Sequence, residues 1–75
     1  MIEGHALAIG TRVRLRSASH AVRLRADTGH IVGFDTYDSL PVVLLDVPAV
    51  YHAADGSTRD LPQLVESEDN LEIVG

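Results

Sequence analysis

The clearest pattern in the sequence is a repeated alternation of apolar and polar residues. From Thr11 the chain places Val13 and Leu15 on one side of an extended backbone and three arginines on the other. A period of two over six residues predicts a half-buried strand. The same four letters, Val-Arg-Leu-Arg, return at residues 22–25 after a break at residues 17–21. We expect this second copy to leave a long loop and lead into the next strand.

The middle of the chain carries two further strand patterns. Residues 28–34 are rich in β-branched residues and contain Gly29 and Gly33, which predict a bulge or sharp bend. Residues 40–47 are apolar on both sides of an extended chain, and Pro48 is expected to end this strand. A strand that is apolar on both faces is covered twice within the fold, or once by a second subunit.

A hairpin is predicted next. Residues 50–54 and 58–65 flank Asp55 and Gly56, a favoured pair for a tight hairpin turn. Pro62 lies within the second arm and cannot donate a backbone hydrogen bond, so this arm is expected to be an edge strand.

The end of the chain completes an all-β prediction. Residues 67–70 have the composition of a single 3-10 turn capped by Ser67, and residues 71–74 form a short closing strand. No segment sustains a helical period. We therefore predict a five-stranded SH3-like barrel with a short 3-10 turn before the last strand. The barrel would span residues 11–75, preceded by a flexible arm over residues 1–10.

Composition narrows the classes of function. The chain of 75 residues has a formal net charge of −5, which argues against a general nucleic-acid binder. Residues 1–34 nevertheless carry five arginines against two acids, and residues 35–75 carry one arginine against nine acids. Such a chain can pair with itself, within one barrel or between subunits. There is no cysteine, no signal-peptide pattern and no apolar run that could span a bilayer, so we expect a cytoplasmic protein without membrane contact.

Charged and aromatic residues suggest binding rather than catalysis. The four histidines lack metal-ligand spacing, and no nucleophile motif or phosphate-binding loop is present, so we predict no catalytic residue, metal or cofactor. The three aromatic residues are too few for base stacking. The arginines either pair with acids on neighbouring strands or contact nucleic acid or an acidic protein surface. These candidates are Arg12, Arg14, Arg16, Arg23 and Arg25.

Self-association is the other expected property. The strand over residues 40–47 would supply the contact between subunits, and Tyr51 would add an aromatic side chain to it. The candidate interface residues are Val43, Leu45, Val47 and Tyr51.

Two resemblances follow from these segments. The chain from Gly10, with GTRVRL, LRADTGHIVGF, VVLLD and EDNLEIV, resembles small bacterial SH3-like or KOW-like barrel proteins of uncharacterised function. IGTRVRLRS followed by TGHIVGF is also similar to the type B dihydrofolate reductases, which are SH3-like barrels assembled as tetramers around one pore. This second resemblance implies Gln63, Leu64 and Arg16 as candidate pore residues, although the tyrosine and the first lysine of that family's pore are missing here.

The prediction that agrees best with these observations is a non-enzymatic, self-associating interaction module whose partner the sequence does not specify. The alternatives are an enzyme with its active site at a symmetric oligomer interface, or nucleic-acid binding through the arginine-rich strands.

Overall fold

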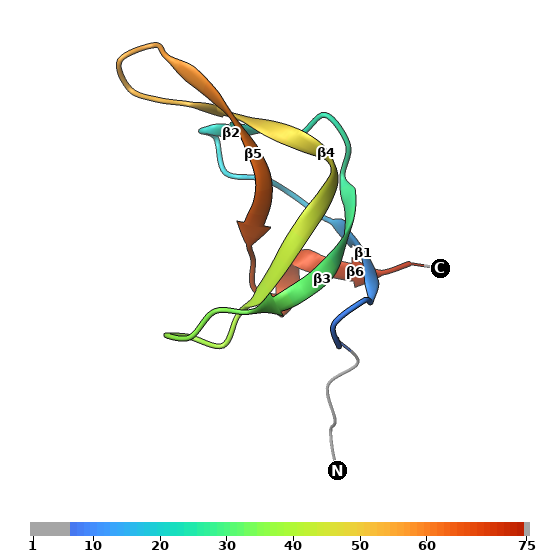
Figure 1. The fold of residues 1–75 in the computed structure, drawn as a ribbon. Helices are drawn as coiled ribbons and strands as arrows, with labels where there is room; N and C mark the ends of the chain where they lie inside the picture. Colours follow the sequence, from blue (N-terminus) through green and yellow to red (C-terminus); the bar gives the residue numbers. More distant parts are fainter. Residues whose placement is uncertain (1–6, 75) are drawn as a thin grey trace.

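The chain folds as a single antiparallel sheet with one short 3-10 turn (Figure 1). The computed structural model describes residues 7–74. Its elements are β1 (Arg12–Leu15), β2 (Val22–Arg23), β3 (Thr28–Phe34), β4 (Pro41–His52), β5 (Thr58–Val65), η1 (Glu68–Asn70) and β6 (Leu71–Ile73). The all-β class is confirmed. The described residues form six strands, however, and the sheet is not closed into a barrel.

β4 is the central strand of this sheet. Its first half pairs with β3 and its second half with β2, while β5 follows its other edge. β1 then pairs with β3, and β6 pairs with β1. The extra strand relative to our prediction is β2, where the second Val-Arg-Leu-Arg copy forms two residues of ladder against Val50 and Tyr51.

The prediction that Pro48 ends the strand is wrong. β4 continues through Pro48 to His52, and Figure 1 shows that this long strand is sharply bent. The pairing with β5 is interrupted between Leu44, opposite Gln63, and Ala49, opposite Leu61. Both Pro48 and Pro62 fall inside this interruption. Proline is tolerated at such a site because the broken ladder does not require its missing N–H group.

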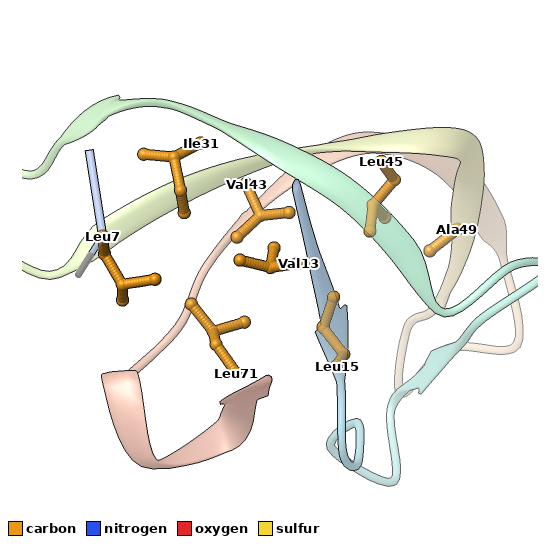
Figure 2. Packing of buried hydrophobic residues seen from close by; sticks show 8 residues of the cluster. All are labelled: Leu7, Val13, Leu15, Ile31, Val43, Leu45, Ala49 and Leu71. Atoms are coloured by element: carbon orange, nitrogen blue, oxygen red, sulfur yellow. The ribbon is translucent and has the colours of Figure 1, made fainter. Parts of the chain in front are cut away.

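The core lies on the concave side of the sheet, where apolar side chains from several strands meet (Figure 2). These residues are Leu7, Val13, Leu15, Ile31, Val43, Leu45, Ala49 and Leu71. Gly29 is buried among them. Only glycine fits at this position, because a Cβ atom there would collide with the carbonyl oxygen of Leu44. Gly33, in contrast, marks the predicted bulge, since the β3–β4 register shifts between Ile31 and Gly33.

The segment before β1 is docked from Leu7 onward. The Leu7 side chain belongs to the core, and the Gly10 N–H donates to the Ile31 carbonyl at 2.7 Å. Residues 7–10 therefore pack on the sheet, although the sequence places them in a flexible arm. Residues 1–6 of that expected arm, and Gly75, lie outside the described residues.

The predicted 3-10 turn is confirmed over Glu68–Asn70, but a different residue holds it. Ser67 occupies the N-cap position without a side-chain capping hydrogen bond. The Asn70 side chain instead accepts from the Ser17 N–H at 3.1 Å and the Ser17 hydroxyl at 2.9 Å. Its Nδ2 donates to the Ser17 carbonyl at 2.9 Å and to Glu66 at 2.7 Å. Asn70 thus ties the turn to the chain that leaves β1.

Candidate binding surfaces

Arg12 is engaged by an acid on another strand. Its two terminal nitrogens each donate to one oxygen of Asp46 at 2.8 Å, and the Thr28 hydroxyl donates to Asp46 Oδ2 at 2.6 Å. The hydrogen bonds from Arg12 and then Thr28 hold the pKa of Asp46 well below its usual range. The same contact raises the pKa of Arg12. The first arginine of the row is therefore neutralised within the chain.

Two more of the five arginines have carboxylate partners at longer range. Arg14 lies 3.5 Å from Asp27 and 4.0 Å from Glu72, and Arg25 lies 3.7 Å from Asp60. All of these side chains are about half exposed, so each pair stabilises the fold little. The pairs nevertheless cancel charge that a nucleic-acid face would need.

Arg16 and Arg23 differ from the other three. No carboxylate within residues 7–74 lies in ion-pair distance of either guanidinium, and both side chains are exposed. Arg16 follows β1 and Arg23 lies on β2, and β4 and β3 lie between these two strands. The five arginines therefore do not form one continuous free cationic surface.

The residues suggested by the reductase resemblance are not gathered within one chain. Gln63 is exposed on β5, while Arg16 follows β1, and β3 and β4 lie between these two strands. Leu64 is half-buried against the core. A site containing both Gln63 and Arg16 would need more than one copy of the chain.

The residues expected at a subunit contact fall on two sides of the sheet. Val43 and Leu45 are 0% and 5% exposed and lie in the core of the single chain, so they offer no surface for a partner. Val47 is 40% exposed, in the part of β4 where the pairing with β5 is interrupted. Tyr51 is half-buried, with the Arg59 guanidinium 5.1 Å from its ring centroid. The core of the single chain therefore takes the face of β4 that we assigned to the contact.

The other face of the same strand carries an aliphatic patch. Val42 pairs with Val65 on one side and Gly33 on the other, and Leu44 lies between Gln63 and His30. Val32 and Val65 are 38% and 45% exposed. We call this surface, formed by Val32, Val42, Leu44 and Val65, the outer patch. The alternation of side chains along a strand implies this surface, because Val42 and Leu44 must point away from Val43 and Leu45.

Three surface hollows accompany these features. The largest, about 570 Å³, is lined by Leu7, Phe34, Asp38, Ser39, Leu40, Glu68 and Asp69. A hollow of about 450 Å³ is lined by Arg23, Leu24, Arg25 and Val50. The third, about 230 Å³, lies at the base of the β4–β5 turn beside Tyr51 and Arg59.

Neither a metal site nor a membrane span is visible in the described part of the chain. Within residues 7–74, no group of three or more His, Asp or Glu side chains is placed to hold a metal ion. Nor does this part contain a helix with the length and apolar character needed to cross a bilayer. Comparison with protein-family models, curated proteins and solved structures gives no significant match. Functional inference therefore rests on the surfaces themselves.

Proposed function

We propose that the protein is a non-enzymatic interaction module that associates with a second copy of itself through the outer patch. The observation that carries this proposal is the contiguous aliphatic surface on β3, β4 and β5. A sheet face of this kind is normally covered by another layer. In the single chain Val42 and Leu44 are half-buried, and Val32 and Val65 stay 38% and 45% exposed.

Charge next to the patch favours a second copy as the partner. The chain has a net charge of −5, so two copies repel one another in general. Asp46, two residues after Leu44 on the same face, is nevertheless neutralised by Arg12. Electrostatic repulsion between two copies is therefore weak at the place where their outer patches meet.

A face-to-face contact also agrees with the edges of the sheet. β5 pairs only with β4 among the described strands, and it contains Pro62 and the charged residues Arg59 and Asp60. Proline and charged residues on an edge disfavour pairing with another strand. Association through strand addition at β5 is thus less favourable than packing of one sheet face on another.

A second candidate function has one supporting observation. Gln63 lies opposite Leu44 and borders the outer patch, so a symmetric contact would bring Gln63 of two copies together. This is the arrangement expected of an enzyme built at an oligomer interface. An assay of NADPH-dependent dihydrofolate reduction tests that candidate, and no turnover at high protein concentration would exclude the reductase activity.

The proposal is tested by the dependence of molar mass on concentration. Sedimentation equilibrium of the wild type should show a reversible dimer, and Val65→Glu should be monomeric because it buries a charge in the contact. Ile73→Glu is the matched control, since Ile73 is 50% exposed on β6, outside the patch. A wild type that stays monomeric to millimolar concentration would contradict the proposal. So would equal loss of association in both variants.

A further inference from the structure

The hollow beside β2 combines positive charge with an apolar surface. Its lining residues are Arg23, Leu24, Arg25 and Val50, with a volume of about 450 Å³. Arg23 lies directly opposite Val50 in the β2–β4 ladder. The lining residues therefore include two arginines and no acidic residue, in a chain whose net charge is −5.

Both arginines retain hydrogen-bonding capacity. Arg23 has no carboxylate in ion-pair distance among residues 7–74. Within residues 7–74, the only carboxylate in ion-pair distance of Arg25 is that of Asp60 at 3.7 Å; the Arg25 and Asp60 side chains are 51% and 67% exposed. The contrast is Arg12, whose two terminal nitrogens are both occupied at 2.8 Å.

We infer that this hollow is a binding site for a phosphate group, held jointly by Arg23 and Arg25. One guanidinium can donate to both oxygens of a carboxylate, as Arg12 does to Asp46. A phosphate monoester has three terminal oxygens and up to two negative charges, so it can accept a pair of hydrogen bonds from each of two arginines. Leu24 and Val50 provide an apolar wall for the group that carries the phosphate. The site is distinct from the outer patch, which lies on the first half of β4.

Asp60 acts as an internal competitor in this arrangement. It lies on β5 opposite Val50, and its carboxylate contacts the same Arg25 that the phosphate would use. The Asp60 charge therefore competes with a bound phosphate for Arg25 and repels it. It follows that removing the Asp60 charge should strengthen phosphate binding, whereas removing Arg23 should weaken it.

The experiment is a titration with inorganic phosphate, followed by amide and arginine Nε–H chemical shifts at constant ionic strength. Shifts are expected at residues 23–25 and 50, with dissociation constants in the millimolar range. Arg23→Gln should weaken binding by about tenfold or more, because a charge-assisted hydrogen-bond donor is lost. Asp60→Asn should strengthen it about two- to fivefold, the range of an exposed ion pair.

Matched controls separate a site from general attraction. Arg16→Gln removes an exposed arginine outside the hollow and should leave the affinity unchanged, and Asp69→Asn is the corresponding control for Asp60→Asn. Acetate at equal ionic strength should give no saturable shift. Equal effects of Arg23→Gln and Arg16→Gln would overturn the inference, as would equal binding of acetate or unsaturated shifts up to high phosphate concentration.

Two further ligands identify the source of the phosphate. Phenyl phosphate should bind more tightly than inorganic phosphate, because its ring contacts Leu24 and Val50. A short single-stranded oligonucleotide carries only phosphodiesters, each with one negative charge and two terminal oxygens. Tighter binding of the monoester supports the site as a receptor for phosphorylated small molecules or side chains. Tighter binding of the oligonucleotide through the same residues supports the phosphate site and assigns it to a nucleic-acid backbone.

Discussion

Arg12 on β1 and Asp46 on β4 form a two-pronged ion pair that spans the strand between them, with both N–O distances at 2.8 Å. Thr28 on that middle strand, β3, donates the third hydrogen bond to the same carboxylate. One carboxylate therefore links three strands on the outer face. The arginine row that suggests a binding face in the sequence begins with a residue whose role here is structural.

This network predicts how stability depends on pH. The pKa of Asp46 is lower in the folded chain than in the unfolded chain, so its ionised form favours folding. The contribution should be fully present above the unfolded pKa of about 4 and should decline as the pH falls toward the lower folded pKa. Asp46→Asn should lower the urea midpoint at pH 7, and its difference from wild type should shrink as the pH falls below about 4.

Asp69→Asn is the control for this measurement, because it removes one negative charge from η1 and Asp69 forms no ion pair within residues 7–74. Its urea midpoint should stay close to that of wild type at pH 7. A constant difference between wild type and Asp46→Asn from pH 7 to pH 2 would contradict the assignment.

The two glycines of β3 should respond very differently to an added methyl group. Gly29→Ala places its Cβ against the Leu44 carbonyl oxygen and 2.9 Å from Val43 Cγ1, so β3 and β4 must move apart. We expect a loss of about 1–3 kcal/mol or more in the free energy of unfolding. Gly33→Ala meets no atom within 4 Å and should change stability by less than about 0.5 kcal/mol. Equal losses in urea titrations of the two variants would refute the close approach at Gly29.

The alternation of residues predicted most of the strands but not how the sheet is covered. Val13 and Leu15 were correctly separated from the arginines, since a strand with one polar face has only one possible orientation. Residues 42–45 are aliphatic without a break, so their pattern gives no preference for either face. The pairing of Val43 with Ile31 and Leu64 decides the question, and such long-range pairs cannot be derived from local pattern.

The candidate sites show the same limit. The arginines were identified from composition, but their partners Asp46 and Asp60 lie 34 and 35 residues away from Arg12 and Arg25 in the chain. Pro48 was expected to stop a strand because proline removes a ladder hydrogen bond. It instead lies within β4 where the ladder with β5 is already interrupted, and Pro62 lies there too. Only the fold reveals that the two prolines share one interruption.

Adjacent valines on β4 test the assignment of the two faces. Val43 is fully buried, so Val43→Ala should reduce the free energy of unfolding by about 1–3 kcal/mol through lost burial and the cavity left behind. Val42→Ala should change it by much less, but should weaken self-association through the outer patch. Urea unfolding of dilute samples and sedimentation equilibrium measure the two effects separately. If Val42→Ala caused the larger loss of stability, Val42 would face the core and Val43 would face outward, contrary to the assignment.

Asn70 and Ser67 distinguish how the 3-10 turn is held. Asn70→Ala removes the side-chain contacts to Ser17 and Glu66 and leaves the Ser17 N–H without its acceptor. We expect a loss of about 1–3 kcal/mol in the free energy of unfolding, because one side chain supplies several hydrogen bonds between distant segments. Ser67→Ala should cost less than about 0.5 kcal/mol, since the Ser67 side chain makes no capping hydrogen bond. Hydrogen exchange of the Ser17 amide provides an independent measurement. Its exchange rate should rise in Asn70→Ala and should not change in Ser67→Ala. If Ser67→Ala were the more damaging variant, the turn would be held by its cap, as the sequence suggests, and not by Asn70.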